Sequence, residues 1–247
     1  MRGSNSTRKV SSFAPAVFAV GLCLSVSVLS TSPAKAQTAS ADAWGRQASQ
    51  QAAQVREWVI ATGDNSGLPF VIIDKVQAKV FVFAGDGQIQ GSAAALLGVA
   101  RGDTTVAGIG ERELSTIRPE ERTTPAGRFI SALGRDLANK DVLWVDYAAS
   151  VSLHAVVTSN PKEHRLQRLA TASPLDNRIS FGCINVPPEF FEGVVRPAFA
   201  GTYGIVYVLP ELAPISQAIA GYAGADALAG RAASAPMRKT AEGIPTP

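Results

Sequence analysis

Short apolar runs separated by turn residues fill the chain between Leu68 and Pro210, and they restrict this region to a β-rich fold. The runs have the length of strands and are rich in β-branched and aromatic residues. Gly85-Asp86-Gly87-Gln88 has the composition of a hairpin loop. The expected strands cover residues 69–73, 79–83, 92–99, 142–145, 151–157 and 203–209. A helix is expected to begin at Pro187-Pro188, because proline suits a first helical turn. We therefore predict an all-β or β-rich sandwich that carries a few short helices.

The first 36 residues have the pattern of an export signal. A positively charged start precedes an uncharged apolar stretch over residues 13–29, and Ala34-Lys35-Ala36 forms a small-x-small cleavage site. We predict cleavage after Ala36 and a mature chain that begins at Gln37. The alternative is a retained membrane anchor, since the stretch is near the lower length limit for spanning. Its Ser, Gly and Pro residues and the cleavage pattern favour removal.

The basic charge of the full chain comes from this segment. The whole sequence has 23 basic and 20 acidic residues, and four of the basic residues but none of the acidic ones lie in residues 1–36. The mature chain therefore keeps 19 basic residues against 20 acidic ones. This balance gives no indication of nucleic-acid binding. We expect no nucleic-acid partner and, after cleavage, no stable membrane span.

The two ends of the mature chain differ in composition from the β region. Residues 37–67 form an N-terminal extension with a predicted amphipathic helix over residues 39–62, broken at residues 63–67. The helical spacing is carried by Trp44, Ala48, Ala52, Val55 and Val59. Residues 211–247 form an Ala/Pro-rich tail, in which residues 215–228 are expected to make a short helix and the last fifteen or so to be disordered. A spacer without chemistry is the favoured interpretation of the tail.

The cysteine content points to one residue. Cys23 lies inside the signal and follows Leu22, where a lipoprotein site would need a small residue, so Cys183 alone remains. A lone thiol in an exported chain is a buried apolar filler, an intermolecular bridge or a nucleophile. Its neighbours favour the nucleophile. Gly182 permits close approach of a ligand, and Ser180 and Asn185 place hydrogen-bonding groups on either side.

A cysteine nucleophile needs a base or another neighbour that lowers its pKa, and the chain has two histidines. His154 lies on an expected strand, which holds a side chain in a fixed direction, whereas His164 lies in a polar loop among charges. We therefore predict His154 as the general base. The alternative is a half-buried core histidine.

The turn around the thiol supplies further candidates. Acyl transfer builds negative charge on a carbonyl oxygen, which backbone N–H groups near Gly182 are placed to stabilise. Ser180 is expected to orient the loop or the base, and Asn185 to bind substrate backbone. Turn-stabilising hydrogen bonds are the alternative for both residues. Thr123-Thr124-Pro125-Ala126-Gly127-Arg128-Phe129 is a second local motif, which by itself indicates only a tight turn with a strand following.

Taken together, these segments resemble the catalytic domain of the L,D-transpeptidase (YkuD-like) family over residues 68–210. Val71 to Phe83 looks like the family's opening hairpin, and Thr124 to Phe129 looks like its Thr-Pro-x-Gly-x-Phe turn. Leu153-His154 resembles the strand that bears the catalytic histidine. Ser180-Phe181-Gly182-Cys183-Ile184-Asn185 resembles the nucleophile signature, and Gly201 to Val206 is similar to the closing strand. The resemblance implies a mainly β sandwich of mixed sheets.

Two features depart from the family pattern. Phe181 occupies the position where the family usually has a histidine that supports the site. The family also places its catalytic histidine some 14 to 17 residues before the signature serine. Here 25 residues separate His154 from Ser180, and 15 separate His164 from it. Counting favours His164, but strand context favours His154, with residues 158–177 as an inserted, Arg-rich loop.

The resemblance implies an exported, periplasmic cysteine acyltransferase of cell-wall biogenesis. By analogy, the Cys183 thiolate attacks a stem-peptide carbonyl in peptidoglycan, expels D-alanine and forms a thioester, which an amine from a second stem or a wall-attached protein resolves. No metal or organic cofactor is implied. Arg178 would suit stem-peptide carboxylates, and so would Arg165 and Arg168, for which a solvated loop is at least as good an interpretation.

Three other functions are considered. With water as the acceptor, the same acyl-enzyme would make the protein an L,D-carboxypeptidase or hydrolase. A wall-binding or scaffold protein with a weakened site is a second alternative, for which Phe181 would be the sign of decay. A papain-like protease is disfavoured, because that fold places its cysteine before its histidine in the chain.

Overall fold

The computed structural model describes residue 44 and residues 47–222. The predicted signal, residues 1–36, and the tail from residue 223 lie outside the described residues, so these predictions stay untested. No helix among the described residues is long and apolar enough to cross a membrane.

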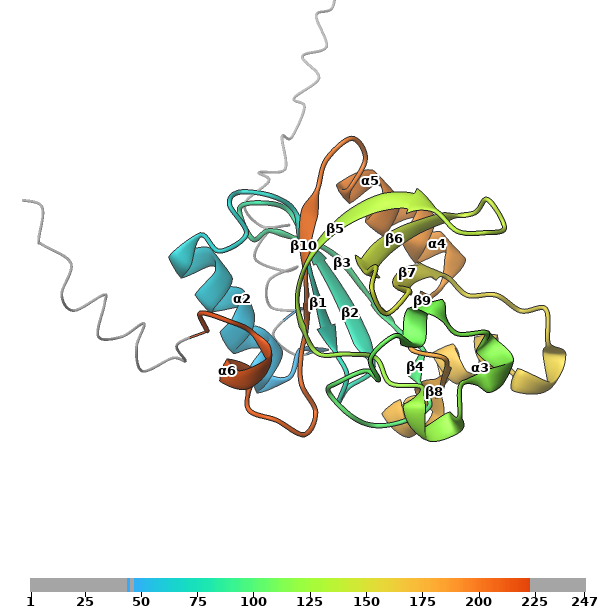
Figure 1. The fold of residues 1–247 in the computed structure, drawn as a ribbon. Helices are drawn as coiled ribbons and strands as arrows, with labels where there is room; N and C mark the ends of the chain where they lie inside the picture. The colour runs from blue at the N-terminus through green and yellow to red at the C-terminus, as the bar shows by residue number, and fades with distance from the viewer. Residues whose placement is uncertain (1–43, 45–46, 223–247) are drawn as a thin grey trace, which may run out of the picture.

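An eight-stranded mixed sheet dominates the fold (Figure 1), with the strand order β3-β2-β1-β10-β5-β6-β7-β9. Neighbouring strands are antiparallel except for the parallel pairs β1–β10 and β7–β9. A short parallel pair, β4–β8, forms a second sheet. An antiparallel bridge between Leu96 and Asn185 brings the two ends of the large sheet together, so the sheet is nearly closed. The strands are β1 (Phe70–Asp74), β2 (Lys79–Phe83), β3 (Ile89–Ala94), β4 (Leu97–Gly98), β5 (Gly127–Arg135), β6 (Asp141–Asp146), β7 (Val151–Ala155), β8 (Arg178–Ser180), β9 (Ile184–Val186) and β10 (Gly204–Val208).

Alternate residues of the central strands enter two different cores. Val71 and Ile73 of β1 face an inner core enclosed by the sheet, whereas Phe70 and Ile72 face an outer core. Strands β2 and β10 alternate in the same way, because successive side chains of a strand point to opposite faces. Burial on both faces explains why these strands are continuous apolar runs in the sequence.

Helix α2 (Gln50–Thr62) covers the outer face of the sheet together with α6 (Ile215–Ala218), as Figure 1 shows. Ser49 caps its first turn, and Gly63 ends it in the left-handed conformation with φ 67°. Its buried residues, Ala52, Val55, Trp58 and Val59, belong to the outer core. The N-terminal helix therefore packs as part of the folded unit. The predicted tail helix is shorter than expected within the described residues.

A helical stretch between β9 and β10 packs against the inner core on the opposite side of the sheet. It consists of α4 (Pro188–Phe190), the π-helix η6 (Phe191–Val195) and α5 (Arg196–Ala198). The helix predicted to begin at Pro187-Pro188 is therefore present. Residues 158–177, predicted as an inserted loop, contain α3 (Arg165–Ala170) and the 3-10 helices η4 (Pro161–Glu163) and η5 (Pro174–Asn177).

The prediction of a mainly β sandwich of mixed sheets with a few short helices is confirmed. The main difference concerns residues 92–99, which were predicted to continue one strand. They divide between β3, which pairs with β2, and β4, which pairs with β8 of the other sheet. The segment that follows, residues 99–126, contains no strand but the 3-10 helices η1 (Ile109–Glu111), η2 (Leu114–Thr116) and η3 (Pro119–Glu121).

Candidate active site

Cys183 lies in a tight turn between β8 and β9. The Ser180 hydroxyl donates a 2.6 Å hydrogen bond to the Cys183 carbonyl and accepts one of 3.1 Å from the Gly182 N–H. Gly182 has φ 131°, which favours glycine. Ser180 therefore fixes the shape of the turn, consistent with the orienting role expected from the sequence. The Gly182 N–H, expected to face a developing oxyanion, is bonded to Ser180 in this structure.

His154 lies on β7 beside the turn, because β7 and β9 run parallel with His154 opposite Asn185. Its Nδ1 contacts the Ala155 carbonyl oxygen at 2.8 Å. A carbonyl only accepts, so Nδ1 carries the proton and Nε2 is the basic nitrogen. His154 and Cys183 lie near enough for each to shift the pKa of the other, and the sulfur itself contacts the Ser152 hydroxyl and the Ser150 carbonyl oxygen, each at 3.7 Å. The structure thus brings together the two residues that the sequence singled out.

The interaction shifts the pKa of both groups. Burial alone would raise the pKa of the Cys183 thiol, but the nearby imidazole of His154 and the backbone and hydroxyl of Ser152 lower it below its ordinary value. Burial lowers the pKa of His154, while Cys183, the Ala155 carbonyl and Asp136 raise it, and the net shift is upward. The groups around the pair thus lower the proton affinity of the thiol and raise that of the imidazole.

Ser152 is a site residue that the sequence reasoning missed. Its hydroxyl lies 3.7 Å from the Cys183 sulfur. The position two residues before His154 on the same strand was a usable signal, because residues at i and i+2 share one face of a strand.

Asn185 lies between the imidazole and the inserted loop. Its Nδ2 is 3.3 Å from His154 Nε2 and 3.4 Å from the Cys183 carbonyl oxygen. Its Oδ1 accepts a 2.6 Å hydrogen bond from Arg165 of α3, and Arg165 also pairs with Glu163. Asn185 is 1% exposed. Its amide therefore contacts the general-base candidate, and the binding of substrate backbone expected from the sequence stays a prediction.

The other basic residues of the insertion lie away from the thiol. His164 is exposed and adopts a left-handed backbone conformation at the start of α3, with φ 49°. Arg168 donates to the carbonyl oxygens of Glu163 and Asp176. Of the two histidines, His154, which strand context favoured over residue counting, is the one whose pKa Cys183 shifts.

Thr124 connects the Thr-Pro-x-Gly turn to the cysteine turn. Its hydroxyl donates a 2.8 Å hydrogen bond to the Gly182 carbonyl oxygen and accepts one of 2.9 Å from the Gly98 N–H. All three groups are buried. The motif that indicated only a tight turn in the sequence thus anchors the nucleophile's loop.

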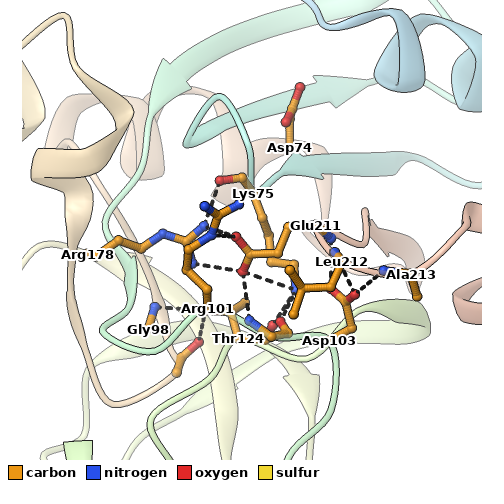
Figure 2. A network of polar contacts seen from close by, with 12 residues as sticks. Asp74, Lys75, Gly98, Arg101, Asp103, Thr124, Arg178, Glu211, Leu212 and Ala213 are labelled. Carbon is orange, nitrogen blue, oxygen red and sulfur yellow. Dashed lines mark hydrogen bonds and ion pairs between the residues drawn. The ribbon is translucent and has the colours of Figure 1, made fainter. Parts of the chain in front are cut away.

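A buried ionic cluster lies behind this anchor (Figure 2). Lys75 donates to Asp103 at 2.8 Å and to the Thr124 carbonyl at 2.9 Å, with its side chain fully buried. Burial lowers the pKa of Lys75, and the facing carboxylates oppose that shift. Burial opposes ionisation of Asp103 too, but hydrogen bonds with Lys75 and with the N–H groups of residues 211–213 lower its pKa to about 2.

Arg178, a substrate-binding candidate from the sequence, belongs to this cluster. Its guanidinium donates to Glu211 at 2.7 and 3.2 Å and to the Lys75 carbonyl at 2.9 Å, as Figure 2 shows. The Glu211 side chain is completely buried and also pairs with Arg101. These contacts favour a structural role for Arg178 over the expected contact with a substrate carboxylate.

Two cavities lie against the dyad. A cavity of about 80 Å³ contains the thiol and is lined by Phe181 and by residues of the 99–126 segment. The Arg122 guanidinium stacks on the Phe181 ring at 3.8 Å and donates to the Ile117 carbonyl. A larger cavity of about 270 Å³ lies at His154. The charged residues that line it are Asp136, Lys140, Asp141 and Glu192.

No group of side chains within residue 44 and residues 47–222 has the composition of a metal site.

Several solved structures match the chain at low sequence identity. The L,D-transpeptidase LdtMt1, determined in complex with imipenem, is 15% identical with a TM-score of 0.33, and the match covers 57% of this chain and 58% of that chain. For the catalytic domain of the E. faecium L,D-transpeptidase, identity is 16%, the TM-score is 0.33, and the coverages are 58% and 98%. The helical cell shape determining protein Pgp2 from Campylobacter jejuni is 13% identical with a TM-score of 0.41. That match covers 64% of this chain and 56% of that chain.

The chain thus spans a little over half the length of two of these proteins. No protein-family model matches the sequence. No curated protein matches it either.

Proposed function

We propose that this protein is an exported cysteine acyltransferase of the L,D-transpeptidase type, which acts in the periplasm on peptidoglycan stem peptides. The proximity of Cys183 to His154, which lies on β7 beside the cysteine turn and shifts the pKa of the thiol downward, carries the proposal. The substrate class is supported by the ordered sequence motifs, and the location by the signal pattern of residues 1–36.

In the first half-reaction, the Cys183 thiol gives its proton to Nε2 of His154 as the sulfur attacks the stem-peptide carbonyl. The carbonyl oxygen becomes negative, and the Cys183 N–H, which no hydrogen bond within the described residues engages, is a backbone donor available to it. The C–N bond then breaks, the proton on Nε2 moves to the leaving nitrogen, and D-alanine departs. The product is a thioester on Cys183.

In the second half-reaction, an acceptor amine attacks the thioester carbonyl. His154 takes a proton from that amine and returns it to the departing thiolate. The product is a new amide and a regenerated thiol. Water in place of the amine gives a free carboxylate, which is the carboxypeptidase outcome.

Intact-mass spectrometry of the protein after incubation with purified tetrapeptide muropeptides tests the proposal. We expect an adduct on Cys183 that is absent from Cys183→Ala and strongly reduced in His154→Ala, with His164→Ala close to the parent protein. A variant His154→Ala that forms the adduct at the parent rate would refute the base assignment. Equal binding of muropeptide by the parent and Cys183→Ala, with no adduct in either, would support the wall-binding alternative.

The acceptor is identified in the same reaction mixtures. Chromatography of the products distinguishes cross-linked dimers, which need an amine acceptor, from tripeptide stems, which need water. Added D-amino acid reports exchange at the terminal position.

A further inference from the structure

The orientation of the Asn185 side chain is fixed by chemistry at one end. Arginine only donates hydrogen bonds, so the atom that faces Arg165 at 2.6 Å is the amide oxygen. The amide nitrogen must then face His154 Nε2, at 3.3 Å. The arrangement rests on donor and acceptor chemistry, and it leaves no freedom for the reversed amide while Arg165 is in place.

The same reasoning fixes the state of the imidazole. Nδ1 donates to the Ala155 carbonyl, so a proton on Nε2 as well would make an imidazolium. In that state the Nε2–H would point at the N–H of Asn185, two donors facing each other. The neutral imidazole presents a lone pair there, which accepts from the amide. The Asn185 orientation therefore favours the neutral form.

We infer that Arg165 is a positioning residue, which through Asn185 holds His154 as a neutral base in the resting protein and opposes a preformed thiolate–imidazolium pair. The inference deepens the proposed acyl transfer and rests on it for its functional meaning. Arg165 itself touches neither Cys183 nor His154 in the contacts described, and it acts through the amide alone.

Other charges near His154 also affect the protonation of its imidazole, and most of them oppose the effect of the Asn185 amide. The carboxylates that line its cavity, Asp136 and Asp141 from the β5–β6 hairpin and Glu192 from η6, favour a positive imidazole, and Lys140 disfavours it. From the cysteine turn, Cys183 favours a positive imidazole when ionised. From the insertion, Glu163 neutralises Arg165. Without the fixed amide, these groups together would favour the ion pair.

Nitrogen NMR of the purified protein labelled with ¹⁵N-histidine tests the resting state directly. The chain has two histidines, so the His164→Gln variant assigns both signals. We expect His154 at about pH 8 to be neutral, with the proton on Nδ1. A neutral imidazole with its proton on Nε2, or an imidazolium at that pH, would overturn the inference, and no engineered change at the site is needed to see it.

The pH dependence of Cys183 alkylation by iodoacetamide tests the role of Arg165. In Arg165→Ala the amide is free to reverse, so we expect the apparent pKa of the thiol to fall by roughly one pH unit. At pH values below the thiol pKa, this variant should contain about tenfold more thiolate than the parent. Arg168→Ala is the matched control, because Arg168 lies on the same helix and holds the same loop without contacting Asn185. It should leave the thiol pKa unchanged.

A double-mutant cycle separates the amide from direct electrostatics. The effect of Arg165→Ala should vanish in the Asn185→Ala background if Arg165 acts through the amide. A full effect in that background, or no effect in the parent, would refute the inference. Alkylation and NMR need no substrate, so they remain decisive even if the acyl-enzyme of the proposed function is never observed.

Discussion

The hydroxyl of Thr124 donates a 2.8 Å hydrogen bond to the carbonyl oxygen of Gly182, the residue that precedes the candidate nucleophile. The same hydroxyl accepts from the Gly98 N–H, so one side chain joins β4, the Thr-Pro-x-Gly turn and the cysteine turn. Its backbone carbonyl accepts from Lys75, which extends the connection to the ionic cluster. The position of the thiol therefore depends on residues far from it in sequence.

Replacement of Thr124 by valine tests this anchor. Valine keeps the shape but leaves two buried backbone groups without their partner, so we expect a loss of about 3 kcal/mol in the free energy of unfolding. Urea denaturation measures it. Thr124→Ser keeps the hydroxyl and should lose about 1 kcal/mol, for the missing methyl group. Equal losses in the two variants would show that the hydroxyl contributes nothing.

The strands were predictable because their physical cause is local. Strands β1, β2 and β10 are buried on both faces, and such burial requires continuous apolar runs that can be read from the sequence. Cys183 and His154 were identifiable for a different reason. Their residue types are scarce in this chain, so few candidates existed.

The rest of the site depends on contacts that no local pattern encodes. Thr124 meets Gly182 across 58 residues, and Arg165 meets Asn185 from within an insertion. Arg178 has the charge to bind a substrate carboxylate, but only the fold reveals that Glu211 is its partner. The sequence shows only the polarity of a side chain, because tertiary packing decides its hydrogen-bond partner.

Arg122 is expected to control access to the thiol. Its stacking on Phe181 and its bonds to the Ile117 carbonyl hold the 99–126 segment against a cavity of about 80 Å³, too small for a peptide stem. The stacking is worth about 1 kcal/mol, so Arg122→Ala should raise the alkylation rate of Cys183 by a bulky maleimide roughly fivefold.

Two controls accompany this measurement. Arg118 lies in the same segment, and its side chain pairs with Glu120 and Glu121. Arg118→Ala should therefore leave the alkylation rate unchanged. Iodoacetamide is small and should report a much weaker effect of Arg122→Ala than the maleimide does. Equal maleimide rates for the parent and Arg122→Ala would show that the segment does not restrict access.

Asp103 is expected to make stability depend on acidity. Its pKa in the folded protein, about 2, lies below the ordinary value of 3.8. The ionised carboxylate therefore stabilises the fold at pH values above 3.8. That stabilisation is lost as the pH falls toward about 2. Asp103→Asn should be less stable by about 3 kcal/mol near neutral pH, because the buried Lys75 loses its closest counter-charge.

The loss of stability between pH values of about 4 and about 2 should be smaller in Asp103→Asn than in the parent, as measured by urea denaturation across that range. Asp176→Asn is the control, since the Asp176 carboxylate makes no ion pair within the described residues. A parallel acid response of the parent and Asp103→Asn would contradict the ionic role of Asp103.

Gly182 is expected to tolerate no side chain. An alanine Cβ there would lie 2.9 Å from the Thr123 carbonyl oxygen, and the backbone φ of 131° is one that residues with side chains rarely adopt. We expect Gly182→Ala to lose about 3 kcal/mol of unfolding free energy and most of its thioester formation, because the turn must shift.

Gly193→Ala is the matched control in η6, where a Cβ would meet no atom within 4 Å. It should be neutral or more stable by about 0.5 kcal/mol, since alanine suits a helical backbone better. Urea denaturation and intact-mass measurement of both variants check the contrast, and a Gly182→Ala protein as stable and reactive as Gly193→Ala would rule out a steric constraint on the turn.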